Sequence, residues 1–322
     1  MADSVHVIFG AGQVGTQLAR RLLASGRHVR IARRSDAAVL PGVEVVRGDA
    51  ADAAFCTAAA QSASVVYHCM NPPYSARLWG ELLPRYMSNL IDAASRSGAR
   101  LVVLDNVYML GRPPDGRLDE NTPMRPRSRK GEIRARVADR LFDAHARGIV
   151  RAVSGRASDF YGPGGTLTHV GDQVWPRVLA GKPGRVVIDP DVIHTYHYIP
   201  DVAAGLIVLG DAPDDCYGTP WMLPCEPAVT LRALVKRFKP TLGRPIALAR
   251  MPPSLLKLLA LFVPMMQELG EMAYQWEGSF IVADSRFRAR FGVEPTTADT
   301  AARETVEWAV EHYGKQGADL PH

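Results

Sequence analysis

The sequence predicts an α/β fold in which a doubly wound parallel sheet carries a smaller C-terminal lobe. In the first half of the 322-residue chain, short apolar runs alternate with longer segments that have helical apolar spacing. This alternation indicates βαβ units and a sheet that is buried on both faces. A glycine-rich turn follows the first apolar run, and the alternation weakens after about Gly155, where proline and glycine become frequent.

Each predicted element comes from one such run or segment. The expected strands are Val5–Phe9, His28–Ile31, Val43–Val46, Val65–His68, Leu101–Leu104 and Ile149–Val153. The expected helices are Val14–Ala24, Ala51–Gln61, Leu82–Ser97 and Ile133–Ala146, and then segments near Val170–Ala180, Val202–Leu209, Leu231–Lys239, Pro253–Glu271 and Thr300–His312. We assign residues 1–165 to the sheet domain and residues 166–322 to a mixed α/β lobe, some of whose strands and helices return to the sheet.

Composition excludes several classes of protein. Hydrophobic residues make up 47% and charged residues 22%, as in ordinary globular chains. The net charge of +5 is too dilute to predict a nucleic-acid partner. None of the four cysteines belongs to a C-x-x-C pair, and no histidine pair stands beside them at zinc spacing. We therefore expect reduced thiols, a cytoplasmic location and no metal site.

The chain offers no segment that predicts export or membrane insertion. The first residues lead directly into an apolar strand without the pattern of a signal peptide. The most apolar segment, Leu255–Met266, carries Lys257 and is shorter than the ~20 residues that a bilayer span needs. We expect it to form a helix that lines a pocket or packs on the core, and we expect no membrane partner.

The glycine-rich turn reads Gly10-Ala-Gly12-Gln-Val-Gly15 and lies between a predicted strand and a predicted helix. In such a turn, Gly10 makes the tight bend, Gly12 lets the backbone approach a pyrophosphate, and Gly15 lets the helix pack on the strand. The first helical residues, Gln13 and Val14, would present N–H groups to the phosphates. The pattern predicts a dinucleotide site, and the alternative is a purely structural glycine turn.

Two arginines, Arg33 and Arg34, follow the second predicted strand. Proteins that prefer NAD usually place an acidic residue there, because it binds the ribose hydroxyls. Guanidinium groups instead suit the 2′-phosphate of NADP. We therefore expect NADP(H) to be favoured over NAD(H), although both arginines could also be solvated loop charges.

Further cofactor contacts are expected where the third and fourth strands end. Asp49 and Ala50 follow the third strand, where Asp49 could equally cap the next helix. Cys69, Met70 and Asn71 end the fourth strand. The loop that follows contains Tyr74, which we expect at the substrate.

Taken with these motifs, the sequence resembles the extended short-chain dehydrogenase/reductase superfamily, in its NAD(P)-dependent epimerase/dehydratase group. The similar motifs fall in the family's order and are Gly10–Gly15, Gly48-Asp49, Gly155–Pro163, Tyr196–Asp201 and Phe291–Pro295. The resemblance implies an NAD(P)-binding Rossmann domain and a C-terminal substrate-binding lobe. It also makes a homodimer through the helices Leu82–Ser97 and Ile133–Ala146 a fair expectation.

The catalytic motifs of that family are altered in this chain. Members typically carry a catalytic Ser or Thr after the fifth strand and a Tyr-x-x-x-Lys pair on the next long helix. Here Asn106 stands at the Ser/Thr position, and Lys130 and Arg134 stand at the positions of the pair. The resemblance therefore implies an atypical member, in which Tyr108, Asn106 and Lys130 form the polar edge beside the nicotinamide.

The sequence leaves the proton donor open. Tyr108 could be a displaced phenolic acid whose phenolate is stabilised by the Lys130 ammonium. Lys130 could instead be the donor itself, and it is also expected to contact the cofactor. Both side chains have ordinary alternatives, because Tyr108 could simply pack in the wall of the site and Lys130 could be solvated in a basic segment.

Our main interpretation is an NADPH-dependent oxidoreductase that reduces a carbonyl on a fairly apolar small molecule. The alternatives are a sensor or scaffold that binds NADP(H) without turnover, and an epimerase or dehydratase that retains its coenzyme. Tyr161 and His194 join Tyr74 as expected substrate contacts. His194 stands where nucleotide-sugar epimerases usually carry an arginine that grips the substrate pyrophosphate, which argues against a nucleotide-sugar substrate.

Overall fold

The computed structural model describes residues 5–35, 40–252, 254 and 262–317. These residues form two compact units. Unit 1 comprises residues 1–111, 122–157 and 202–223, and unit 2 comprises residues 112–121, 158–201 and 224–322. Most of the predicted segment Leu255–Met266 lies outside the described residues.

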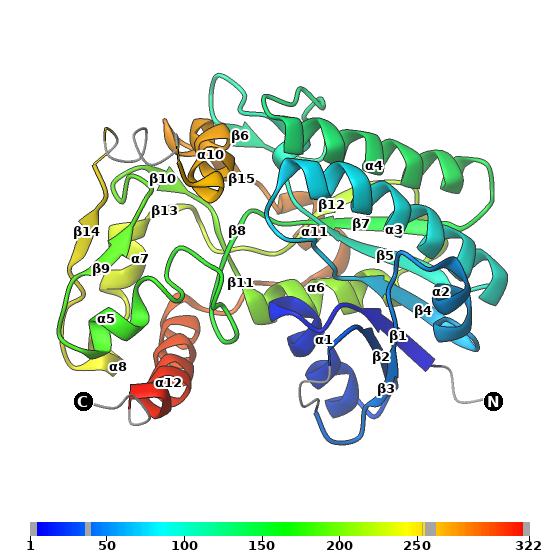
Figure 1. Cartoon of the computed structure of the whole chain (residues 1–322), viewed down its shortest axis with the longest axis horizontal. Coiled ribbons are helices and arrows are strands. Elements are labelled where there is room, and N and C mark those ends of the chain that lie inside the picture. Colours follow the sequence, from blue (N-terminus) through cyan, green and yellow to red (C-terminus); the bar gives the residue numbers. More distant parts are fainter. Residues whose placement is uncertain (1–4, 36–39, 253, 255–261, 318–322) are drawn as a thin grey trace. The chain divides into compact units, whose positions relative to one another are not determined.

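Unit 1 is built around a seven-stranded parallel sheet (Figure 1). Its strand order is β12-β7-β5-β4-β1-β2-β3, and every neighbouring pair is parallel. The strands are β1 (Val5–Phe9), β2 (His28–Arg33), β3 (Glu44–Arg47), β4 (Ala63–His68), β5 (Arg100–Asp105), β7 (Arg151–Arg156) and β12 (Pro220–Met222). The first six coincide with the predicted strands to within three residues at each end.

Helices cover both faces of this sheet (Figure 1). One face carries α2 (Ala53–Ala59), α3 (Ala76–Ser97) and α4 (Arg129–Ala146), and the other carries α1 (Gln13–Ala24) and α6 (Ile199–Asp211). The apolar side chains of α2, α3 and α4 pack on the strands in one continuous cluster that includes Trp79, Leu83, Leu90 and Leu141. Burial on both faces explains why the central strands read as unbroken apolar runs.

The order in which the chain adds strands to the sheet reverses between β1 and β4. The chain builds β1, β2 and β3 outward in one direction and then returns to place β4 on the other side of β1. In such open sheets, ligands bind beyond the carboxyl ends of the strands at this switch point. The segments that follow β1 and β4 therefore mark the place where a site is expected.

Unit 2 contains four two-stranded sheets and several helices. The pairs are β8 (Asp159–Tyr161) with β11 (Tyr196–Tyr198), β10 (Ile193–His194) with β13 (Val229–Thr230), β9 (Gly184–Val186) with β14 (Leu248–Arg250), and β6 (Arg117–Leu118) with β15 (Ile281–Val282). The helices are α5 (Trp175–Leu179), α7 (Leu231–Lys236), α8 (Lys239–Leu242), α10 (Pro264–Glu271), α11 (Ser285–Phe291) and α12 (Ala298–Gly317). Trp175, Phe238 and Tyr198 contribute to its core.

Of the helices in the described ranges, none combines the length and the hydropathy that a bilayer-spanning helix requires. The four cysteines are free thiols, and Cys56, Cys216 and Cys225 are buried.

The close contact between β1 and α1 requires glycine, which has no side chain, at position 15. Gly10 adopts a φ of +102°, which brings the chain sharply round from strand to helix. A Cβ at Gly15 would lie 1.9 Å from the carbonyl oxygen of Gly10, so only glycine fits there. At Gly12, by contrast, a Cβ would meet open space.

We expect Gly15→Ala to lower the free energy of unfolding by about 3 kcal/mol, because the new methyl group would collide with backbone that cannot move aside cheaply. Gly12→Ala is the matched control and should cost less than about 1 kcal/mol, because its methyl group meets no neighbour. Urea denaturation followed by circular dichroism measures both. Equal losses in the two variants would contradict this account of the packing.

Candidate functional site

A cleft of about 200 Å³ opens beyond the carboxyl ends of β1, β2 and β4. It lies entirely within unit 1 and brings together many of the side chains that the sequence predicts for a cofactor. Its predicted members are Gly10, Gly12, Arg33, Arg34, Asp49, Ala50, Cys69, Met70 and Asn71. Phe9, Ala32, Gly48, Phe55 and Tyr86 complete its lining and were not predicted.

Backbone hydrogen bonds that continue the sheet beyond its strands hold the floor of this cleft. The amide of Gly10 donates to the carbonyl of Ala32 at 3.1 Å, and the amide of Cys69 donates to the carbonyl of Phe9 at 2.9 Å. The segments after β1, β2 and β4 are therefore paired side by side. They lie at the switch point of the sheet, where the fold predicts a ligand.

The first turn of α1 begins at this cleft. Its N-cap residue is Gly12, which has no side chain to cap the helix, and the first turn contains no acidic residue. A helix of this length carries a partial positive charge at its N-terminus, which favours an anion. The open space beside Gly12 admits such a group close to the backbone. These residues fit the pyrophosphate of a dinucleotide.

Gln13, Val14 and Gly15 do not line the cleft. Val14 and Gly15 are buried in the contact between α1 and the sheet, and Gln13 is half-buried at the start of the helix. Any contact from Val14 or Gly15 to a ligand would therefore come from the backbone.

Arg33 and Arg34 form the basic side of the cleft. Arg33 donates to the hydroxyl of Ser35 at 3.1 Å through Nε. Arg34 lies 3.8 Å from the Asp49 carboxylate, and both side chains of this ion pair are exposed. Exposed pairs at such distances contribute little, so a phosphate could replace Asp49 as the partner of Arg34.

Cys69 lies at the floor of the cleft as a neutral thiol. Burial raises the pKa of Cys69 to about 12. A neutral thiol is a poor nucleophile, so covalent chemistry at this position is not supported.

A second group of side chains, here called the aromatic–cation cluster, consists of Tyr74, Trp79, Tyr108, Lys130 and Arg134. The Lys130 ammonium lies 4.8 Å from the centre of the Tyr74 ring, and the hydroxyls of Tyr74 and Tyr108 are 3.5 Å apart. Trp79 stacks on Tyr108 with 6.0 Å between ring centres and meets Tyr74 edge-on at 5.6 Å. The structure therefore brings together the predicted residues Tyr74, Tyr108 and Lys130.

The start of α4 explains how Lys130 enters the cluster. The Ser128 hydroxyl caps the helix by accepting from the amide of Gly131 at 3.0 Å. A Cβ at Gly131 would lie 2.6 Å from the carbonyl oxygen of Tyr108, so the first turn of α4 lies directly against the Tyr108 backbone. Lys130, which precedes this contact, is fully buried.

Arg134 lies one helical turn after Lys130 and is also buried. Its guanidinium donates to Asp105 at 3.2 Å and to the amide oxygen of Asn71 at 2.9 Å, and it lies over the Trp79 ring at 4.8 Å. Its Nε has no hydrogen-bond partner among the described residues. Because Asn71 also lines the cleft, Arg134 connects the aromatic–cation cluster to the predicted cofactor site.

Asn106 is held by the turn that it begins. Its side-chain oxygen accepts from the backbone amide of Tyr108 at 3.0 Å, and its backbone amide donates to the Asp105 carboxylate at 2.9 Å. The side-chain oxygen is therefore committed to the backbone. Asn106 retains its amide hydrogens as donors, but it has no proton to transfer.

Two predicted substrate residues lie in the interior of unit 2. Tyr161 is 2% exposed and packs against Tyr198 with 5.4 Å between ring centres. His194 is 1% exposed, donates to Asp159 at 2.8 Å and stacks on Phe280. Burial by itself would raise the pKa of Asp159, but the electrostatic interaction with His169 and hydrogen bonds with His169 and His194 hold this pKa well below its usual range, so Asp159 is a carboxylate.

Sequence reasoning missed Trp79 and Asp105 as members of the site. Trp79 lies in the first turn of α3, and its indole N–H donates to the carbonyl of Pro72 at 3.3 Å, which anchors the loop that carries Tyr74. A tryptophan just after a Pro-Pro loop was the available signal. Asp105 ends a strand beside Asn106, and only its pairing with Arg134 distinguishes it.

Nothing in the described part of the chain groups three or more His, Cys, Asp or Glu residues at a distance suited to a metal ion.

Comparisons with known proteins bear on the family and the fold of the chain. A family model described as the NAD dependent epimerase/dehydratase family matches residues 6–218, more than half of the chain. None of the curated proteins matches the sequence.

Several solved structures have a similar fold. UDP-glucuronic acid 4-epimerase from Bacillus cereus in complex with NAD gives a TM-score of 0.76 at 14% identity, over 95% of this chain and 99% of that chain. UDP-glucose 4-epimerase from Thermus thermophilus in complex with NAD gives 0.74 at 20% identity, over 96% and 99%. dTDP-glucose 4,6-dehydratase from Bacillus anthracis in complex with NAD gives 0.77 at 14% identity, over 96% and 97%. The predicted fold class is confirmed.

We expect Asp105→Asn to lower the free energy of unfolding by about 3 kcal/mol, because it leaves the Arg134 guanidinium buried without a charged partner. The control is Asp143→Asn, which breaks the exposed ion pair with Arg147 and should cost no more than about 0.5 kcal/mol. Chemical denaturation of both variants gives the comparison. A loss at Asp105 as small as the loss at Asp143 would refute the importance of the buried pair.

Proposed function

The chain belongs to the NAD dependent epimerase/dehydratase family, and from this membership we propose that it interconverts a hydroxyl and a carbonyl group on a small molecule while it retains its nicotinamide coenzyme. The single observation that carries the proposal is the link between the cleft and the aromatic–cation cluster, in which Asn71 of the cleft accepts a hydrogen bond from Arg134 of the cluster. The family match favours this retained-coenzyme chemistry over the net carbonyl reduction that the sequence placed first.

The coenzyme would occupy the cleft. A bound coenzyme would supply a nicotinamide ring that can accept a hydride and give it back. Gly12 and the first turn of α1 would hold the pyrophosphate, and the segment from Cys69 to Asn71 would pass beside the inner ribose. Arg33 and Arg34 would bind the 2′-phosphate of an NADP(H) coenzyme.

The aromatic–cation cluster would manage the proton that accompanies the hydride. The resemblance implies that Lys130 stands where similar proteins place a catalytic tyrosine, which would make this chain an atypical member. Its ammonium contacts Tyr74, whose hydroxyl reaches Tyr108. We assign proton transfer to Lys130 and Tyr108, and we assign stabilisation of the substrate oxygen to the Asn106 amide.

The substrate would be a less charged molecule than a nucleotide sugar. The similar structures named above are nucleotide-sugar enzymes, and such enzymes usually hold the substrate pyrophosphate with an arginine. Here His194 stands at that position, is buried, and is bonded to Asp159. Tyr74 would contact the substrate directly, whereas Tyr161 and His194 would support the core of unit 2.

The test of this function uses the protein with a stoichiometric amount of oxidised coenzyme and a panel of secondary alcohols, ketones and nucleotide sugars. We expect one substrate to yield an isomer or a dehydrated product, identified by NMR, with the same amount of oxidised coenzyme before and after. Lys130→Met should slow product formation at least about 100-fold, because it removes the proton carrier. The variant should still bind the coenzyme, which separates loss of the proton carrier from loss of the fold.

Lys182→Met removes an exposed lysine of unit 2 and serves as the control. Tyr108→Phe changes a partly exposed ring, is expected to fold, and should slow the reaction about tenfold. Stoichiometric consumption of coenzyme would restore the reductase interpretation, and tight binding without any product would identify a binding protein. Full activity of both Lys130→Met and Tyr108→Phe would overturn the assignment of the proton carriers.

We also expect the protein to bind NADP(H) more tightly than NAD(H). The double variant Arg33→Gln/Arg34→Gln should weaken NADP(H) binding about 100-fold, because two charge-assisted contacts to the 2′-phosphate are lost. Its affinity for NAD(H) should change less than about threefold. Calorimetric titration with both coenzymes decides the matter, with Arg77→Gln as an exposed control on α3. Tighter binding of NAD(H) by the wild-type protein would show that the arginines play no such role.

A further inference from the structure

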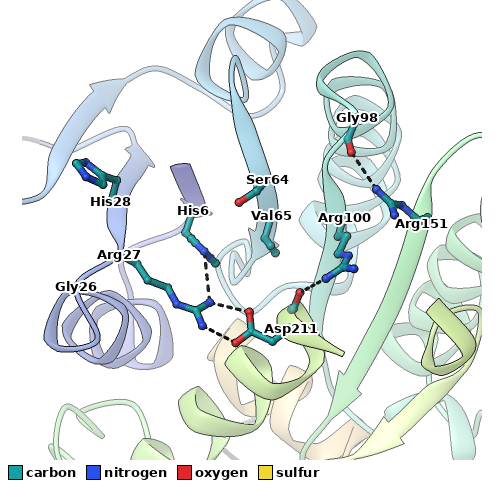
Figure 2. A pocket seen from close by; sticks show the side chains of 11 residues that line it. His6, Gly26, Arg27, His28, Ser64, Val65, Gly98, Arg100, Arg151 and Asp211 are labelled. Atoms are coloured by element: carbon teal, nitrogen blue, oxygen red, sulfur yellow. Dashed lines mark hydrogen bonds and ion pairs between the residues drawn. The ribbon is translucent and has the colours of Figure 1, made fainter. Parts of the chain in front are cut away.

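Figure 2 shows a second pocket of unit 1. It lies at the amino ends of the strands, whereas the cleft lies beyond their carboxyl ends. The second pocket has a volume of about 570 Å³, within the range of small-molecule sites. Its lining comes from the first or second residues of five strands: His6 of β1, His28 of β2, Ser64 of β4, Arg100 of β5 and Arg151 of β7. None of these residues belongs to the cleft or to the aromatic–cation cluster.

One side of the pocket is electrically neutral. Arg27 binds Asp211 through two parallel hydrogen bonds of 2.7 and 2.6 Å. His6 lies beside this pair, with Nε2 at 3.4 Å from Arg27. Burial and the charge of Arg27 lower the pKa of His6 to about 4, so the ring is neutral at neutral pH and offers hydrogen bonding without charge.

The other side holds Arg100 and Arg151, and each of them bonds the end of a helix. Arg100 donates to the carbonyl of Gly210 near the end of α6 at 3.1 Å, and Arg151 donates to the carbonyl of Gly98 at the end of α3 at 3.4 Å. Helix C-termini favour cations, which accounts for arginines at this edge. Each bond uses one of the five N–H donors of a guanidinium.

The Asp214 carboxylate neutralises only part of the positive charge of Arg100 and Arg151. A single oxygen of Asp214 lies 3.7 Å from Arg100 and 3.5 Å from Arg151, and the Asp214 side chain is 67% exposed. Both contacts are ion pairs at long range. One carboxylate therefore faces two guanidinium groups, and this side of the pocket keeps one positive charge in excess.

We propose that this pocket is a binding site for a small phosphorylated molecule, separate from the coenzyme site. A phosphoryl group has enough oxygens to bond Arg100 and Arg151 at the same time, which the shared Asp214 carboxylate does not. The remaining volume beside His6 and Ser64 would hold the rest of the ligand. The ligand would link the amino ends of β5 and β7 and stabilise unit 1.

The test is calorimetric titration with inorganic phosphate at low ionic strength, because salt screens partly exposed charges. The protein carries Arg33→Gln/Arg34→Gln, which removes the basic side of the coenzyme cleft, and phosphate bound at the start of α1 would be recognised because Arg151→Gln leaves it unchanged. We expect saturable binding with one site. No heat in this background would overturn the proposal, whatever the protein does with a coenzyme.

Three further variants locate the bound phosphate. Arg151→Gln should weaken binding about tenfold, because it removes one charged donor. Asp214→Asn should tighten binding about fivefold, because it removes the competing carboxylate, and a variant that fails to fold cannot produce this gain. Arg77→Gln, at an exposed position outside the pocket, should change nothing.

Acetate separates a phosphoryl site from a general anion site. We expect acetate to bind at least tenfold more weakly than phosphate, because it offers only two oxygens. Equal binding of acetate, unchanged binding in Arg151→Gln, or weaker binding in Asp214→Asn would each refute the assignment.

Discussion

The buried guanidinium of Arg134 is the interaction on which the arrangement of the candidate site depends. It bonds Asp105 at the end of β5 and Asn71 beyond the end of β4, and one face of it covers Trp79. A charge held this far from water is tolerated only while its partners remain in place. The start of α4, two strand ends and the loop that carries Tyr74 are therefore fixed relative to one another, and Lys130 takes its position from them.

The carboxyl and amino ends of the parallel strands, called here the carboxyl edge and the amino edge, lie beside opposite ends of the helices and therefore beside opposite partial charges. At the carboxyl edge, α1 begins beside Gly12 and presents the positive end of a helix to the cleft. At the amino edge, α3 and α6 end, and Arg100 and Arg151 bond their last carbonyls. The first edge attracts an anion through backbone groups. The second edge attracts one only because its arginines outnumber the Asp214 carboxylate that faces them.

Local sequence was sufficient to predict the elements whose signals are local. The first six strands and the Gly10–Gly15 turn follow from apolar runs and glycine spacing, because each is specified by neighbouring residues. Helix α3 begins at Ala76, six residues before its predicted start at Leu82. β12 returns to the sheet from a proline-rich segment that has no strand pattern of its own. The pairs Arg134–Asp105 and Trp79–Tyr108 join residues about 30 positions apart, which no local pattern reports.

Lys130 and Arg134, both buried on α4, differ in the proton chemistry that each side chain could perform. Arg134 cannot serve as a proton carrier, because a guanidinium does not lose its proton in proteins, and its donors are directed to Asp105 and Asn71. Lys130 has a transferable proton, and the ring contact with Tyr74 holds its ammonium away from water. A tyrosine at that position would exchange a proton as phenol and phenolate, whereas a lysine exchanges it as ammonium and amine. Loss of the proton lowers the charge of either side chain by one unit, so a lysine in this role would leave a neutral amine beside the substrate oxygen, where a tyrosine would leave an anion.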